Sequence, residues 1–339
     1  MTNEMTVLDI IDRTAKRRDE RRSFLRAAGG ATALVGGLSL LAACSDDDDD
    51  PVGTTPAPTP SPTANADVDV LNFALNLEYL EAQFYAYAAF GTGLNASLLT
   101  GTGTQGAVIT TAGATGTGVP RQVTFTSPVI AEYAREIAID EIAHVNFLRA
   151  ALGNSAAAQP AINISGGAGS PFAAAATAAG VPGGSTFDPY ANENFFLLGA
   201  YIFEDVGVTA YKGAAPLITN KTFLEAAAGI LAAEAYHAGI LRTVLYNRGV
   251  TVPDLRTGAN LISNARDSLD GASDIDEGIT GTNPAISNIV PTDANGLAFS
   301  RNTNQVHHIV YLNATAGVSS GGFFPAGTNS AFRVAAANP

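Results

Sequence analysis

The 339-residue sequence has little of the chemistry that several classes of protein need. Cys44 is its single cysteine, so no disulfide can form within the chain. It has no tryptophan and only four histidines. Its 18 Lys and Arg residues are outnumbered by 31 Asp and Glu residues, which gives a net charge of −13. We therefore do not expect nucleic acid or an anionic membrane surface as a partner, whereas cations are attracted.

Residues 1–43 lack a pattern that could build a core. They carry Arg21-Arg22 before a short apolar run that ends at Cys44, which resembles a twin-arginine export signal followed by a bacterial lipoprotein box. The alternative is a transmembrane helix, but the run is short and rich in Gly and Ala. We expect an exported protein on the periplasmic side of a bacterial cell envelope, anchored by lipid on Cys44. Because no Asp directly follows Cys44, the outer membrane is the expected membrane.

Residues 44–66 are predicted to form an extended tether. They contain the acidic run 46–50 and then a stretch rich in Pro and Thr, and neither can build a core. Once residues 1–43 are removed, 11 basic and 26 acidic residues remain, so the net charge becomes −15. The remaining chain is divided into a helical region, 67–249, and a C-terminal tail, 250–339, which is expected to pack on that region.

Two short motifs organise the helical region, and both read Glu-x-x-His. The first runs from Glu141 to His144 and the second from Glu234 to His237, each among helix-forming residues. Positions three apart share one face of a helix, so each carboxylate and its imidazole can bind one metal ion together. The apolar and basic residues around the motifs also match, as if one helix had been used twice.

A second pair of acidic residues supports this interpretation. Tyr85 follows Glu78 by seven residues, and Tyr211 follows Glu204 by the same distance. Seven residues make about two helical turns, so each Glu and its Tyr share a face. Glu81 lies at the edge of that face, and Glu78 is preferred because of the spacing to Tyr85. The resulting order, Glu, Glu-x-x-His, Glu, Glu-x-x-His, is that of the dinuclear carboxylate site in ferritin-like bundles.

Start and stop signals predict four helices over about 67–90, 127–153, 188–216 and 219–249. Each helix carries a Glu on its apolar face, and a buried carboxylate is costly unless it is paired or bound to metal. The fold class is therefore all-α, an antiparallel four-helix bundle with long loops at 92–126 and 154–187. A short hairpin is expected near Val123. Asp140 is expected to orient a ligand imidazole, and on one side only, because its counterpart is Ala233. His307 and His308 are adjacent and are not expected to be ligands.

The sequence resembles the ferritin-like superfamily, and within it the desiccation-related group. The stretches that carry the resemblance are 76–85, 140–144, Glu204 and 234–237, with further similarity in the tail at Arg301 and 321–325. This resemblance implies a site of two iron or manganese ions. It implies that Glu141 and Glu234 bridge the ions, that Glu78 and Glu204 are terminal or bridging ligands, and that His144 and His237 each bind one ion. It also implies that Tyr85 and Tyr211 hydrogen-bond the carboxylates or donate electrons.

The expected function is redox chemistry on oxygen or peroxide in oxidative, metal or desiccation stress. One alternative is peroxide dismutation of the manganese catalase type. Another is a non-enzymatic, stress-protective or structural protein in which the metal only stabilises the bundle. A ferritin-type storage cage is not expected, because the tether, the long loops and the tail would have to fit a closed shell. The sequence leaves a homodimer open.

Overall fold

The computed structural model describes residues 65–109, 119–281 and 286–338. The predicted signal, and the predicted tether apart from its last two residues, lie outside these ranges. The described residues form seven α-helices and two very short strands, so the all-α prediction is confirmed. None of the helices in the described part of the chain is long and apolar enough to cross a membrane.

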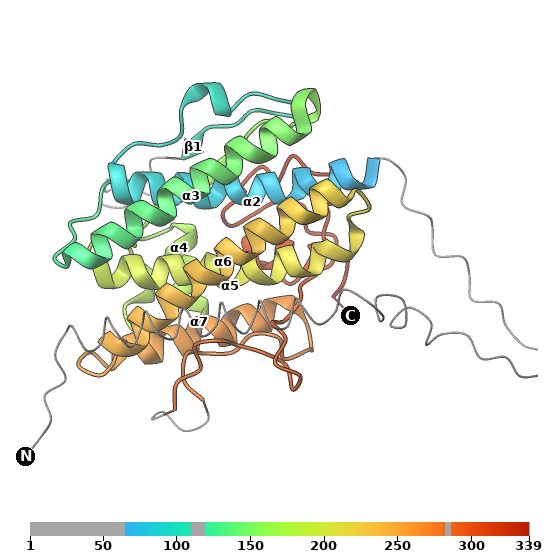
Figure 1. The fold of residues 1–339 in the computed structure, drawn as a ribbon. Coiled ribbons are helices and arrows are strands. Elements are labelled where there is room, and N and C mark those ends of the chain that lie inside the picture. Colours follow the sequence, from blue (N-terminus) through green and yellow to red (C-terminus); the bar gives the residue numbers. More distant parts are fainter. Residues whose placement is uncertain (1–64, 110–118, 282–285, 339) are drawn as a thin grey trace, which may run out of the picture. The chain divides into compact units, whose positions relative to one another are not determined.

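Four long helices make the bundle: α2 (Asn65–Phe90), α3 (Pro128–Leu152), α5 (Glu193–Ala214) and α6 (Lys221–Arg248). Figure 1 shows α3 lying beside α2 and running back along it, and α6 doing the same beside α5. The bundle is therefore two antiparallel pairs. Helix α2 is buried on nearly every side from Val70 to Ala89, because α3, α5 and the C-terminal tail all cover it.

The helix starts follow from capping chemistry, with one correction. Ser127 caps α3 and Pro128 is its first residue, as predicted. The predicted start of α5 at residue 188 is wrong, because the helix begins at Glu193 and Asn192 caps it. The Asp188 carboxylate instead accepts a hydrogen bond from the backbone N–H of Tyr190. Asp and Asn both favour caps and turns, so the sequence alone did not separate the two.

The loops carry structure that the sequence analysis missed. Strand β1 (Val108–Ile109) pairs in parallel with β2 (Ile162–Asn163), so the two long loops lie against each other. Helix α4 (Pro171–Ala178) lies within the second loop. The hairpin expected near Val123 is wrong: residues 119–127 contain no strand, and the N–H of Val123 donates to the carbonyl of Ala88 at the end of α2.

The C-terminal tail lies on the bundle and contains two helices, α7 (Asp254–Asp270) and α8 (Thr303–Val310). Helix α7 contacts α5 and α6, and α8 contacts α5. A buried network of charges joins the tail to the bundle. In it Arg242, Arg266 and Arg301 pair with carboxylates at 2.6–2.9 Å, those of Asp205, Asp270 and Asp276. Such a network tolerates little change, because removal of one partner leaves a buried charge unpaired.

Candidate metal centre

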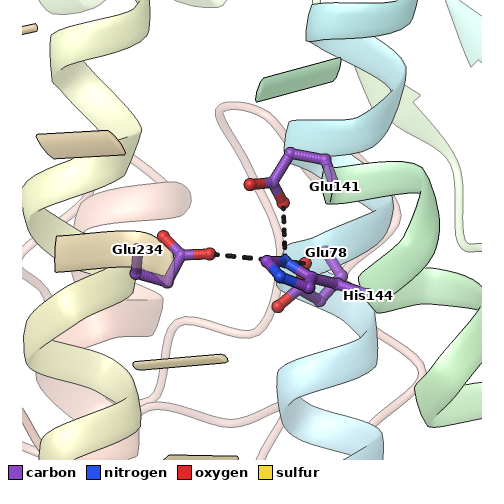
Figure 2. A group of neighbouring side chains, drawn as sticks. All are labelled: Glu78, Glu141, His144 and Glu234. Carbon is purple, nitrogen blue, oxygen red and sulfur yellow. Dashed lines mark hydrogen bonds and ion pairs between the residues drawn. The ribbon is translucent and has the colours of Figure 1, made fainter. Parts of the chain in front are cut away.

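Six side chains meet at the centre of the bundle, and they are the six predicted metal ligands. Their ligand atoms form two overlapping groups, and within each group all of these atoms lie within 4.8 Å of one another. One group is Glu78 of α2, Glu141 and His144 of α3, and Glu234 of α6. Figure 2 shows these side chains pointing toward one another. The other is Glu141, Glu204, Glu234 and His237. Glu141 and Glu234 belong to both groups, as ligands between two ions would.

The histidines turn the same ring nitrogen toward the carboxylates. His144 Nδ1 lies 3.2 Å from Glu78 Oε2, 3.5 Å from Glu141 Oε2 and 3.8 Å from Glu234 Oε1. His237 Nδ1 lies 3.1 Å from Glu141 Oε1 and 3.5 Å from Glu204 Oε2. The two ring centroids are 6.3 Å apart. Each half of the site thus presents one imidazole nitrogen to a set of carboxylate oxygens.

The tyrosines bond carboxylates of the opposite pair of helices. The Tyr85 hydroxyl on α2 donates to Glu204 Oε1 on α5, and the Tyr211 hydroxyl on α5 donates to Glu78 Oε1 on α2. The seven-residue spacing predicted that each Tyr shares a face with the Glu of its own helix. It did not show that the hydrogen bonds cross between the pairs, which ties the two halves of the bundle together at the site.

Asp140 supports a histidine of the other pair. Its Oδ2 lies 3.2 Å from Nε2 of His237 on α6, although in the sequence it stands one turn before His144. A proton on Nε2 directed at this carboxylate leaves the Nδ1 lone pair for a metal ion. The matching position on α6 is Ala233, which carries no acid. The support is therefore one-sided.

The donor set fits a metal site. Both oxygens of Glu141 and of Glu234, Glu204 Oε2 and His237 Nδ1 are buried, and within the described ranges none has a hydrogen-bond partner. Several of these atoms lie at ion-pair distances from one another, but not in hydrogen-bond geometry. Buried polar atoms normally have partners. Buried carboxylate oxygens that face imidazole nitrogens without bonding them suit a divalent metal cation.

The carboxylates at the site raise the pKa values of both histidines strongly in the metal-free protein. Burial alone lowers the pKa of His144, but the carboxylates of Glu78 and Glu141 outweigh it and raise the pKa to about 10. Burial likewise lowers the pKa of His237, and Glu204 and Glu141 raise it to about 12. Without metal, both rings are therefore positively charged imidazolium groups at neutral pH. A metal ion that binds Nδ1 has to displace the proton on that nitrogen.

The carboxylates divide into charged and protonated groups. Burial raises the pKa of Glu141, but the imidazoles of His144 and His237, whose Nδ1 atoms lie 3.5 and 3.1 Å from its oxygens, lower it to about 2. Burial raises the pKa of Glu78 to about 7. Burial and then the charge of Glu141 hold the pKa values of Glu234 and Glu81 well above the ordinary range. A cluster that cannot carry all its negative charge without metal gains stability from a cation.

Three further residues outside the two ligand groups, Glu81, His307 and His308, are buried. Glu81 is buried and stands near the site, although it was set aside in favour of Glu78. His307 and His308 lie outside the cluster in α8, and both are fully buried. His307 bonds the carbonyl of Thr303 and the hydroxyl of Thr328, so its role is structural.

Comparison with known proteins agrees with this geometry. The profile of the family described as "Ferritin-like domain" matches residues 66–247. The chain belongs to this ferritin-like family. It is 33% identical over 252 residues to desiccation-related protein PCC13-62 of Craterostigma plantagineum, and the match covers 69% of this chain and 74% of that protein. It is 27% identical over 276 residues to ferritin-like catalase Nec2 of Nesocodon mauritianus, and this match covers 77% of this chain and 83% of that protein. No solved structure is a significant match.

Proposed function

We propose that this ferritin-like protein holds two iron or manganese ions and carries out redox chemistry on oxygen or peroxide. The observation that carries the proposal is the pair of overlapping ligand groups that share Glu141 and Glu234. Glu78 and His144 would complete the ligands of one ion, and Glu204 and His237 those of the other. Two adjacent ions can share two electrons and hold both oxygens of a peroxide.

Neighbouring side chains would hold the metal ligands in position. The Tyr85 and Tyr211 hydroxyls restrict the rotation of Glu204 and Glu78, so these carboxylates stay aimed at the centre. Asp140 holds the ring of His237 in the same way. Orientation by such outer groups typically accounts for about 10–100-fold in metal affinity or activity.

Access to the site favours a small substrate. The carboxylates of the two groups are almost fully buried, and 4% of the His237 side chain is exposed. The His144 side chain is 11% exposed, the most of the six. An oxidant of two heavy atoms, such as oxygen or hydrogen peroxide, would reach the site along this edge more readily than a large organic substrate, which would require the helices to part. Oxygen and peroxide therefore suit the site.

Peroxide dismutation is the second candidate, and a similarity favours it: one relative is named a ferritin-like catalase. In dismutation peroxide acts as both oxidant and reductant, so the reaction releases oxygen without any added reductant. In a ferrous oxidase reaction, ferrous iron supplies the electrons and oxygen is consumed. The other relative is named only for desiccation, which keeps the non-enzymatic, protective role as a third candidate.

The test uses the purified full chain loaded with iron or with manganese. We expect each loaded protein to melt at a higher temperature than the metal-free protein, and one of them to consume peroxide or to oxidise ferrous iron under oxygen. The variant Glu204→Gln should lose turnover, and Glu136→Gln, an exposed acid on α3, should keep it. Stabilisation without turnover would favour the protective role. No stabilisation by either metal would refute the metal site.

We also propose that the chain is exported and anchored by lipid on Cys44, in a cell that experiences oxidative, metal or desiccation stress. The support is the order of Arg21-Arg22, the short apolar run and the single cysteine. The variant Cys44→Ser should move from the membrane fraction to the soluble fraction of the envelope. If this variant stays in the membrane fraction, the apolar run itself is the anchor.

A further inference from the structure

Helix α2 buries a second carboxylate beside the centre. Glu81 lies one turn after Glu78, and 5% of the surface of this residue is exposed. It lines a cavity of about 10 Å³, which is close to the space of one water, together with Gly207 of α5, Val310 of α8 and Phe323. The described residues place no hydrogen-bond donor on the Glu81 carboxylate and no cationic side chain within ion-pair distance of it. A buried carboxylate with no partner is costly and therefore needs an explanation.

The internal symmetry of the bundle gives that explanation. Glu78 of α2 corresponds to Glu204 of α5, so the position three residues later is Glu81 in one half and Gly207 in the other. In the second half this position faces a shared ligand: a Cβ added at Gly207 would lie 2.3 Å from Glu234 Oε2. The symmetry therefore predicts that the equivalent position in the first half faces the centre as well, and there the side chain is a glutamate.

The geometry points to Glu81 as a fifth carboxylate of the metal centre. It stands outside both groups of converging ligand atoms, and the cavity that it shares with Gly207 would let its side chain turn toward the ions. This inference rests on the proposed function, because it needs metal ions at the site. The partner that Glu81 lacks in the metal-free chain would then be the metal pair. Glu81 shares its cavity with Val310 of α8, so it would approach the centre from the side that α8 covers.

A fifth carboxylate changes the charge that the site prefers. Four carboxylates with two neutral histidines balance two divalent ions, and a fifth leaves one negative charge over. That excess favours a pair in which one ion is trivalent, a state that iron and manganese reach and zinc does not. Since zinc otherwise binds nitrogen and oxygen ligands more tightly than iron(II) or manganese(II), Glu81 would bias the centre toward the redox-active metals.

The test compares wild type with Glu81→Gln, which has the same shape without the negative charge, and with the exposed control Glu136→Gln. The probes are manganese(II) in competition with a chelator, the metal retained after dialysis, and the electron paramagnetic resonance spectrum of the manganese-loaded protein. We expect Glu81→Gln to bind manganese about 10–100-fold more weakly and to change the spectrum. Wild-type affinity together with a wild-type spectrum in Glu81→Gln would overturn the inference.

The metal-free variant keeps the test independent of folding. Glu81→Gln removes an unpaired buried acid, so its melting temperature without metal should equal or exceed that of wild type. A large fall in the metal-free melting temperature would instead show that Glu81 holds the helices together, and this would also overturn the inference. If the wild-type protein itself retains no metal, the result refutes the proposed function as a whole and not the role of Glu81 in particular.

Discussion

Gly207→Ala tests whether Glu234 holds metal from the position that the structure gives it. The new Cβ would lie 2.3 Å from Oε2 and 3.0 Å from Cδ of Glu234. Cβ atoms essentially never approach a neighbour closer than 3.0 Å, so the difference from 2.3 Å requires the carboxylate to move by about 0.7 Å or more. Glu234 is 0% exposed and belongs to both ligand groups. The displacement would therefore affect both ions of the proposed centre.

Two effects of opposite sign set the magnitude. A displacement of this order at a metal ligand should cost about 10–100-fold in metal affinity, or about 1.4–2.7 kcal/mol. Alanine in place of glycine within a helix should stabilise the metal-free protein by about 0.5–1 kcal/mol, which offsets the local crowding. Gly207→Ala should therefore melt close to wild type without metal and gain much less stability when manganese or iron is added.

The assay is thermal melting with and without metal, together with chelator competition for manganese(II). The matched control is Gly229→Ala on α6, because nothing lies within 4 Å of a Cβ added there. This control receives the same gain in helix propensity and should bind metal like wild type. If Gly207→Ala binds manganese as tightly as Gly229→Ala does, Glu234 is not a metal ligand in this position.

Three further predictions concern the support of the site and the tail. Tyr85→Phe and Tyr211→Phe each remove a hydrogen bond to a buried carboxylate and should lower the free energy of unfolding in urea by about 1–3 kcal/mol; an unchanged value would contradict the crossed bonds. Burial lowers the pKa of His307 to about 4 from 6.5. Between these pH values the unfolded chain binds more protons than the folded chain, so the free energy of unfolding falls as the pH drops from 6.5 to 4. His307→Gln should remove about 3 kcal/mol of that fall, measured by urea unfolding across this pH range. The same pH dependence in both proteins would refute this prediction. Arg301→Met leaves Asp270 buried without its partner and should cost about 3–5 kcal/mol, which Asp270→Asn should partly restore.

The helices and the members of the cluster could be predicted from the sequence because both depend on local spacing. A separation of three positions from Glu to His, and of seven from Glu to Tyr, places side chains on one helix face whatever the helix packs against. Ser127 before Pro128 marks a helix start for equally local reasons. These signals predicted the bundle and selected six side chains that the structure brings together.

Helix α7 was missed because its stability is not local. Gly258, Asn260 and Ser263 are poor helix formers, and its buried face includes the charged residues Arg266 and Asp270. Those charges are acceptable only because Asp205, Asp276 and Arg301 come from other parts of the chain to pair with them. The buried positions of α7 do recur at helical spacing, but part of that face is polar or charged, so it is not recognisable as an apolar face.

What only the tertiary structure decided is how the two pairs of helices meet. The sequence placed Tyr85 on the face of Glu78 and Asp140 one turn before His144, but the contacts cross to Glu204 and His237. It also set Glu81 aside, and only the packing of α5 and α8 on α2 shows that this carboxylate is buried beside the centre. The spacing along one helix determines which side chains share a face. The neighbour that each of them touches depends on where another helix crosses that face, and only the folded chain determines that.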